Sequence, residues 1–332
     1  MKSYKIAVDE NIFIKDEICP AGSKMLYNFK SPYSATVIEK IKGAGAGFEI
    51  AAQSKTAEFG SAAGHGLTDT ADIALGIDVD GAAYMSAVKN NLFYIKPTYG
   101  TVSRFGVAAN VSSVDQVGVY AKNLEDGFSV LSVIAGHDKN DGTTYPAQKY
   151  DYAPAAGILK TAKFSDIDFK YADCLAEVYF IISAAEFSSN ISRFDGLKFG
   201  YRTEDFRNIN DMVINSRSEG FTTETKLRLL MGAYVLSEGQ FEKYYLKATR
   251  LRRLIKQELD VLFKTVDVII HTVPDSGASY YDRLKFSALA NLTGRPAVIM
   301  PGPARNGLQI IAKEFNEDKL FAFGKELLKD EL

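Results

Sequence analysis

Hydrophobic and polar positions alternate along the chain in two ways: short apolar runs of β type, and longer stretches whose apolar residues recur at three- and four-residue steps. The stretch 123–136 has an N-cap asparagine, acidic residues in its first turn, an apolar stripe and a C-terminal glycine, which together predict a helix. Further helices are expected at 35–42, 172–189, 223–236 and 241–263, and strands at 4–8, 117–120, 266–270 and 297–300. This alternation of strands and helices is typical of an α/β fold.

Two loops are predicted where Pro, Ser, Gly and Asp cluster, at 136–154 and 274–279. Neither loop is long enough or polar enough to be an interdomain linker, and the chain shows no repeat or low-complexity tract. We therefore expect residues 1–332 to form a single domain.

Composition narrows the class of protein. Hydrophobic residues make up 46% and charged residues 24% of the 332 residues, which excludes a disordered chain, a collagen and a bare coiled coil. Lys and Arg number 39 against 41 Asp and Glu, giving a net charge of −2. The chain thus lacks the positive footprint that polyanion binding needs, and no direct contact with nucleic acid is predicted.

Cysteine usage and the two ends of the chain bear on location. Cys19 and Cys174 cannot make a disulfide framework and match no zinc spacing, so reduced thiols are expected. The N-terminus reaches Asp9 before an apolar stretch develops, and no run approaches the roughly 18 apolar residues of a membrane span. We expect a cytoplasmic protein without membrane contact. The last four residues, K-D-E-L, spell an endoplasmic-reticulum retention address, which without a signal peptide we interpret as coincidence.

Three local patterns have a plain explanation. The glycines of 43–47 follow a predicted helix, whereas phosphate-binding loops run from strand to helix, so a tight helix exit is expected. A set of acidic residues with one histidine matches no metal-ligand template, and neither a metal nor a cofactor is expected; its members are His65, Asp69, Asp72, Asp78 and Asp80. The basic residues on the predicted 241–263 helix could contact phosphate but are more often a solvated or partner-facing surface; they are Arg250, Arg252, Arg253 and Lys256.

One longer stretch carries a family resemblance. The residues L-F-Y-I-K-P-T-Y-G-T-V-S-R-F-G at 92–106, followed by S-S-V-D-Q-V-G at 112–118, closely resemble a hallmark of the amidase signature family. Collinear matches continue at 135–138, 188–196, 217–221, 234–237 and 307–311, and within the family they look most like the A subunits of glutamyl-tRNA(Gln)/aspartyl-tRNA(Asn) amidotransferases. The resemblance implies an α/β/α layered fold around a large central mixed β-sheet, here shortened at the N-terminus.

The resemblance also implies a catalytic mechanism, whose parts this chain lacks. Family members hydrolyse amides with a serine nucleophile, a second serine in a cis peptide and a lysine, because a hydroxyl needs a base within hydrogen-bond reach. In I-A-V-D-E-N-I at 6–12, Asp9 stands where the family motif has lysine, followed by Glu10. In G-I-D-V-D-G-A-A-Y at 76–84, Ala82 replaces the attacking serine. The cis-serine segment is absent, and only Ser61 resembles its end.

The turn before the nucleophile and the substrate pocket depart from the family pattern too. Asp80 replaces one of the glycines whose backbone N–H groups face the developing oxyanion. A family F-D-E stretch that holds the glutamine ammonium is matched by Asn316 in its second place, while Tyr234 is kept. No catalytic residues are expected, and the degenerate pocket is predicted to comprise Asp9, Glu10, Ser61, Asp78, Val79, Asp80, Gly81, Ala82, Tyr234, Ser279 and Asn316.

Three hypotheses follow. The first is a catalytically degenerate amidase-fold protein, a structural or regulatory partner that pairs with B-type or A-type amidotransferase subunits or with itself. The second is an active glutamine amidase with a rewired site, its nucleophile Ser61, Ser86 or Thr70 and its base Asp9, Glu10 or His65. The third is a small-ligand sensor in which Asp9, Asp78 and Asp80 attract a cation. Against the third, buried carboxylates are tolerated where they pair with neighbours such as Lys96 or Arg104.

Overall fold

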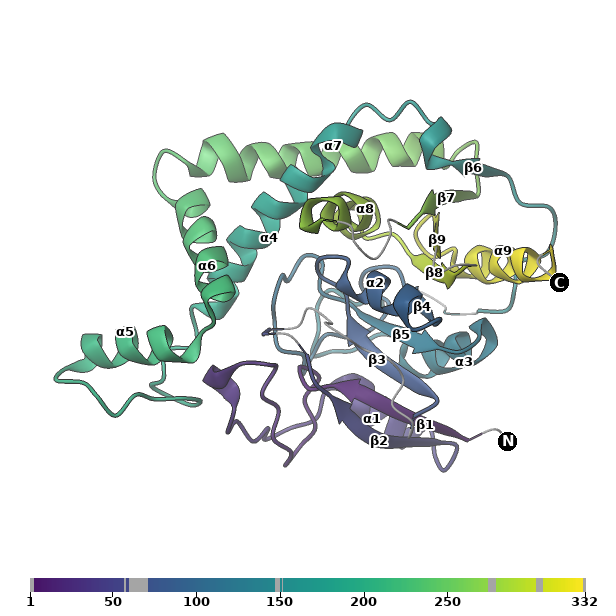
Figure 1. Cartoon of the computed structure of the whole chain (residues 1–332). Coiled ribbons are helices and arrows are strands. Elements are labelled where there is room, and N and C mark those ends of the chain that lie inside the picture. Colours follow the sequence, from purple (N-terminus) through teal and green to yellow (C-terminus); the bar gives the residue numbers. More distant parts are fainter. Residues whose placement is uncertain are drawn as a thin grey trace.

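A mixed β-sheet runs through the protein (Figure 1). The computed structural model describes residues 3–56, 58–59, 71–146, 150, 152–273, 279–302 and 307–330. Within these ranges nine strands pair in the order β2-β1-β3-β5-β4-β8-β9-β7-β6. The strands are β1 Tyr4–Asp9, β2 Phe48–Ser54, β3 Ile73–Ile77, β4 Phe93–Lys96, β5 Val117–Ala121, β6 Thr161–Lys163, β7 Val268–Thr272, β8 Ala297–Pro301 and β9 Gly307–Ala312.

The sheet is parallel at its two edges and antiparallel between them. β1 pairs in parallel with β2 and β3, and β6 pairs in parallel with β7, whereas the pairings from β3 through β5, β4, β8 and β9 to β7 are antiparallel. Every residue of β3, β4 and β5 is buried, as expected for strands with layers on both faces. The mixed sheet expected from the family resemblance is confirmed.

Helices cover both faces of this sheet. Tyr94 of β4 packs its ring on Tyr84, whereas its neighbour Ile95 lies against Gly127. Because successive strand residues face opposite sides, the helices that carry Tyr84 and Gly127 lie on opposite faces. The helices are α1 Thr36–Gly43, α2 Ala82–Lys89, α3 Leu124–Ile134, α4 Leu175–Ile191, α5 Ile209–Gly220, α6 Thr223–Leu236, α7 Lys247–Leu262, α8 Tyr280–Thr293 and α9 Glu317–Asp330.

Contacts between aromatic rings show which helices pack together on each face of the sheet. On one face, Phe128 of α3 stacks on Phe321 of α9, with ring centroids 4.5 Å apart, and α1 packs against α3. On the other face, Tyr84 of α2 meets Phe286 of α8, and α4 and α7 pack outside α8. Figure 1 shows α5 and α6 extending away from the sheet. The predicted α/β/α layering is confirmed.

Local sequence accounts for several element ends. The side chain of Asn123 accepts a hydrogen bond from the Asp126 N–H and caps α3 where the sequence predicts it. The glycine-rich stretch 43–47 is the expected helix exit, because α1 ends at Gly43, Gly45 has a φ of 87°, and β2 follows.

Three predicted boundaries are wrong in detail. The strand expected at 266–270 is β7, two residues later, because the N–H of Val266 still bonds to the carbonyl of Leu262 in the turn that ends α7. The helix expected at 241–263 begins with a π-helical segment, Phe241–Leu246, before α7. The helix expected at 172–189 begins with a 3₁₀ turn, Ala172–Cys174, and continues as α4 to Ile191.

Both cysteines, Cys19 and Cys174, are free thiols. Among the helices described, none is both long and apolar enough to cross a membrane.

Candidate functional site

The segment that carries the altered nucleophile motif is a strand–turn–helix unit. β3 ends at Ile77, and α2 begins at Ala82 after a short turn. Gly81 is the N-cap residue and has a φ of 82°, a left-handed conformation that glycine adopts without strain. A Cβ on Gly81 would also come within 3.0 Å of the carbonyl oxygen of Arg283 in α8. The turn therefore requires glycine and holds α2 close to α8, while Val79 is buried in the core.

Two carboxyl groups occupy the N-terminus of α2. The N–H of Ala82 donates to Oδ1 of Asp80 at 3.2 Å, and the N–H of Ala83 donates to Oδ1 of Asp78 at 3.0 Å. The first N–H groups of a helix otherwise have no partner and form a natural site for an anion. Here that site is filled by the chain's own side chains, and the methyl group of Ala82 stands beside it.

Asp78 is the buried centre of this arrangement. Its Oδ2 accepts a hydrogen bond from Nδ2 of Asn291 at 2.9 Å, and Asn291 also accepts one from the Tyr84 hydroxyl. Burial, and then the charge of Asp80, raise the pKa of Asp78 to about 7. The hydrogen bonds from Asn291 and Ala83 and the charge of Lys96 oppose this rise. The carboxyl group therefore holds a proton far above the pH at which an exposed aspartate loses it.

Lys96 is a buried cation whose charge acts on Asp78. Its ammonium group donates to the carbonyl oxygen of Arg295 at 3.0 Å and is buried. Burial lowers the pKa of Lys96 to about 8, although Asp78 and Glu317 act in the opposite direction. Lys96 therefore acts on Asp78 through its charge, while its hydrogen bond goes to Arg295. Arg104 lies beside Asp141, with Nε 3.5 Å from Oδ2.

The buried Asp78 predicts a specific pH dependence. The unfolded chain loses the Asp78 proton near pH 4 but the folded protein keeps it up to about pH 7, so stability should fall as pH rises between these values. Between pH 5 and pH 7 we expect Asp78 to lower the free energy of unfolding by about 2 kcal/mol, as measured by urea unfolding. The Asp78→Asn variant should lose this contribution, while the buried Asp115, whose pKa is raised to about 6, keeps a slope of the same sign. Asp173→Asn, which removes a fully exposed carboxylate, should retain the Asp78 contribution, and equal slopes in all three proteins would contradict the assignment.

Asp9, at the position of the family lysine, lies at the end of β1 and is fully buried. Its Oδ2 would be 2.8 Å from a Cβ on Gly76, so the carboxyl group rests on the bare backbone of β3. Gly76 stands opposite Gly118 of β5, and a Cβ on Gly118 would be 2.4 Å from the ring of Tyr94. The two paired glycines thus make the space that holds Asp9 and Tyr94, and the packing requires both to stay small.

The other described residues of the predicted pocket have hydrogen-bond partners of their own. Glu10 accepts hydrogen bonds from the N–H and hydroxyl of Thr56, and Ser279 caps α8 through a capping box with Asp282. Asn316 precedes α9, and its carbonyl oxygen accepts from the N–H of Lys319. Tyr234 is exposed near the end of α6, where its hydroxyl lies 3.3 Å from Gln240. The structure therefore brings together Asp78, Asp80, Gly81 and Ala82. Ser279 directly precedes Tyr280, which lines a cavity with Asp80, while Glu10, Asn316 and Tyr234 have hydrogen-bond partners outside this group.

A small cavity of about 60 Å³ lies beside Asp80 and is also lined by Glu58, Arg228 and Tyr280. Arg228 lies on α6, six residues before Tyr234, which is about 9 Å of helix. Ligand pockets are usually several hundred Å³, so these described residues enclose room for a small group only. Of the hydroxyls considered as alternative nucleophiles, Ser86 is buried on α2 beside Asn90, while Ser61, Thr70 and the base candidate His65 lie outside the described residues.

The acidic residues considered as a metal cluster are spread along β3. Asp72 precedes the strand and accepts from the N–H of Lys5, whereas Asp78 and Asp80 follow it, about 20 Å away along an extended strand. His65 and Asp69 fall outside the described residues. In the part of the chain that the structure describes, no group of three or more metal-ligating side chains occurs.

Asn291 is a site residue that the sequence does not reveal. It joins Asp78, Tyr84 and Tyr179, yet it is 213 residues from Asp78 and sits in an ordinary helical pattern. No local motif marks it, because its role depends on α8 packing over the N-terminus of α2.

Comparison with known proteins gives consistent results. The family model described as Amidase matches residues 60–164 and 158–321. The A subunit of the glutamyl-tRNA(Gln) amidotransferase of Lachnoclostridium phytofermentans is 33% identical, covering 94% of this chain and 80% of its own length, and that of Leptospira interrogans is 32% identical, covering 97% and 81%. The crystal structure of the corresponding Thermotoga maritima protein shares the fold, with a TM-score of 0.73 at 24% identity over 97% of this chain and 82% of that one.

The lengths of these alignments are informative. The two alignments extend over 395 and 396 residues, more than the 332 residues of this chain. The relatives therefore carry residues between aligned segments that have no counterpart here.

Proposed function

Because this chain belongs to the amidase family, we propose that it is a catalytically degenerate member that acts in the cytoplasm as a structural or regulatory partner of amidotransferase subunits. The observation that carries the proposal is the N-terminus of α2. Alanine stands at the nucleophile position, and Asp80 and Asp78 accept the N–H groups of Ala82 and Ala83. An amide carbonyl that becomes an oxyanion needs free donors at that place, and these two are in use.

The position of Asp9 supports the same proposal. A serine hydroxyl becomes a nucleophile only when a base within reach takes its proton. Residue 82 has no hydroxyl, and residue 9 offers a carboxyl group packed on Gly76 rather than an amine. Loss of the nucleophile alone lowers the catalytic rate of serine hydrolases on the order of a million-fold. We therefore expect this pocket to hydrolyse no amide at a measurable rate.

Exposed apolar side chains support the partner role. The relatives are themselves named as subunits, and α5 and α6, which extend from the body in Figure 1, expose Ile209, Ile214, Leu227, Leu230 and Met231. A groove of about 450 Å³ is lined by Phe221, Leu229 and Leu230. Exposed apolar side chains beside a groove are typical of protein-binding surfaces, and a partner protein that covers these two helices would take the side chains out of water.

The catalytic half of the proposal is tested by ammonia release from glutamine and from a panel of simple amides. We expect the purified full chain to release no more ammonia than a control without protein. Turnover that is abolished by Ser86→Ala or Ser61→Ala would overturn the proposal in favour of a rewired amidase.

The partner half is tested by pull-down with the tagged full chain from its own cells, with bound proteins identified by mass spectrometry. We expect amidotransferase subunits in the wild-type eluate and a marked loss with Leu230→Glu. Leu254→Glu, which changes an exposed leucine on α7, is the matched control and should bind as wild type does. An eluate that contains none of these subunits would contradict this half.

A further inference from the structure

Another cavity, larger than the one beside Asp80, lies at the C-terminal end of α8. Its volume is about 380 Å³, and it is bounded by α7, by residues Leu292 to Gly294, and by the turns that follow β4 and β9. Gly81 touches α8 at Arg283, eleven residues before Gly294 and about 16 Å away along the helix. This cavity is therefore separate from the site around Ala82, and its size falls in the usual range of small-molecule pockets.

The basic residues of α7 supply one wall. Of the four cations noted in the sequence, Arg252, Arg253 and Lys256 line the cavity, while Arg250 is exposed and does not. The expectation of a solvated basic surface is wrong for Arg252, because one face of α7 turns toward α8 and carries this side chain inward.

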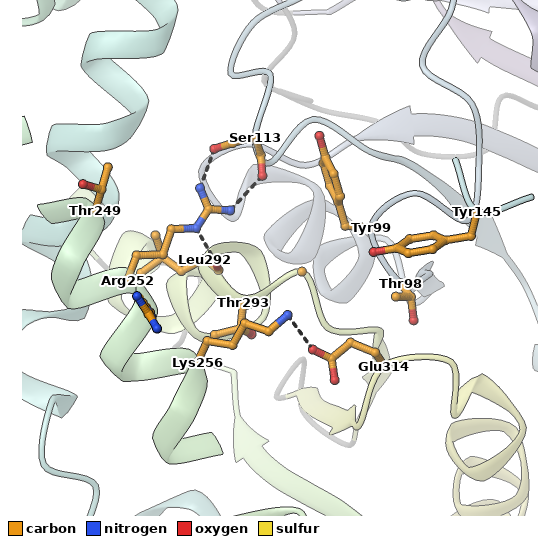
Figure 2. Close-up of a pocket in the computed structure, with 12 residues that line it drawn as sticks. Thr98, Tyr99, Ser113, Tyr145, Thr249, Arg252, Lys256, Leu292, Thr293 and Glu314 are labelled. Atoms are coloured by element: carbon orange, nitrogen blue, oxygen red, sulfur yellow. Dashed lines mark hydrogen bonds and ion pairs between the residues drawn. The ribbon is translucent and has the colours of Figure 1, made fainter. Parts of the chain in front are cut away.

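Arg252 is held rigidly. Its Nε donates to the carbonyl oxygen of Leu292 at 2.6 Å, and its two terminal nitrogens donate to the hydroxyl and carbonyl oxygens of Ser113 at 2.6 and 2.9 Å (Figure 2). A guanidinium group has five N–H donors, so two remain beyond these bonds. The side chain thus presents a fixed positive charge to the cavity.

Negative charge in the cavity is small by comparison. Glu314 is the one carboxylate among the described lining residues, facing three cations. Its Oε1 is 2.9 Å from the ammonium of Lys256, and its Oε2 is 2.9 Å from the buried guanidinium of Arg295. Because Glu314 is shared with Arg295, it does not neutralise the basic wall, and the half-exposed Lys256 can turn from it toward a ligand.

Two tyrosines form the opposite wall. Figure 2 shows Tyr99 and Tyr145 across the cavity from Arg252 and Lys256. The Tyr99 hydroxyl donates to the carbonyl oxygen of Ser112 at 2.8 Å, and Tyr145 packs edge-on against Phe315 with ring centroids 5.0 Å apart. Aromatic faces of this kind accept a flat ring by stacking.

We propose that this cavity binds a small phosphate monoester that carries a flat ring, in the class of a nucleoside monophosphate. Arg253 and Lys256 contact the phosphate, the fixed charge of Arg252 adds to their field, and the ring lies against Tyr145. Charge-assisted hydrogen bonds to phosphate are the strong kind, and guanidinium groups suit them in geometry. The proposal is independent of whether the Ala82 site is degenerate.

Isothermal titration of the full chain with adenosine monophosphate tests the site. We expect binding that weakens about tenfold or more in Arg253→Gln and in Lys256→Gln. Arg250→Gln removes the same charge from the same helix outside the cavity and should bind as wild type does. No binding by wild type at millimolar concentration would overturn the proposal, and so would equal weakening in all three variants, which would indicate a general charge effect.

Inorganic phosphate and the Tyr145→Leu variant test the ring. Wild type should bind adenosine monophosphate more tightly than inorganic phosphate, and Tyr145→Leu should lose that preference while its affinity for inorganic phosphate stays the same. If wild type binds both equally and Tyr145→Leu changes neither, the flat-ring part of the proposal is wrong. A folded-state spectrum for each variant separates lost binding from lost structure.

Discussion

Serine in place of alanine at position 82 is expected to leave amide hydrolysis at the level of buffer. The new hydroxyl would stand at the start of α2, where Asp80 already accepts the N–H of residue 82 and where the family's lysine is replaced by Asp9. In serine hydrolases, loss of the nucleophile lowers the catalytic rate by about six orders of magnitude, and loss of each oxyanion donor lowers it by about two to three. Restoring one part therefore cannot restore the reaction, as an ammonia assay with glutamine should show.

The double variant Ala82→Ser with Asp80→Gly sharpens this test. It frees the N–H of residue 82 and supplies the hydroxyl, but it still lacks a base, so it should remain as inactive as the single variant. An intact amidase, assayed in parallel, gives the rate of ammonia release with which both variants are compared. Measurable turnover by either variant would mean that another side chain serves as the base, and the interpretation of this pocket as degenerate would fail.

Removal of the Arg295 guanidinium is expected to have the largest effect on stability. Arg295 is fully buried between the end of α8 and β8, and it pairs with Asp260 and Glu314. The guanidinium also lies over the ring of Phe263, 4.6 Å from its centroid. Asp260 is about half exposed and Glu314 keeps Lys256, so neither carboxylate is left buried without compensation. The loss comes from the hydrogen bonds that the guanidinium donates to these charged groups and from the ring contact, about 2–3 kcal/mol in all. We expect Arg295→Met to lower the free energy of unfolding by about that amount in a denaturant titration.

A surface ion pair provides the control. Arg207 pairs with Asp211 four residues away on the exposed start of α5, and Arg207→Met should change stability little, because solvent screens such pairs. Arg295→Lys should recover only part of the loss, since an ammonium cannot donate to both carboxylates in the same fixed geometry. An Arg295→Met protein as stable as wild type would contradict the role assigned to this residue.

Strongly patterned segments are where sequence and structure agree best. The capped helix α3 and the apolar strands β1, β5 and β8 lie where periodicity predicts them, because their signals are local. α8 is missed since its apolar residues surround the helix, as its burial from Leu284 onward shows, so no single apolar face marks it. β3 is missed because Gly76 interrupts a short apolar run, and that glycine is required by Asp9 on the neighbouring strand.

In the candidate site, too, some features are visible in the sequence and others only in the structure. The replacements at Asp9, Asp80 and Ala82 are visible in the sequence because each falls inside a contiguous motif. The bonds from the Ala82 and Ala83 N–H groups to Asp80 and Asp78 are short-range too, but the sequence does not say that these side chains turn back onto the helix. Tyr234, which the motif placed in the pocket, is exposed near the end of α6, six residues after Arg228, which lines the cavity beside Asp80.

By itself the sequence determined which chemical groups this chain possesses and lacks, and that strands and helices alternate, because residue identity and periodicity are properties of neighbouring positions. Only the tertiary structure decided which of those groups meet. Asn291 reaches Asp78 across 213 residues, and Arg252 reaches Ser113 across 139, because packing of α8 and α7 on the sheet brings them together. Burial, and with it the raised pKa of Asp78 and the positive cavity beside α7, follows from that packing and from nothing local.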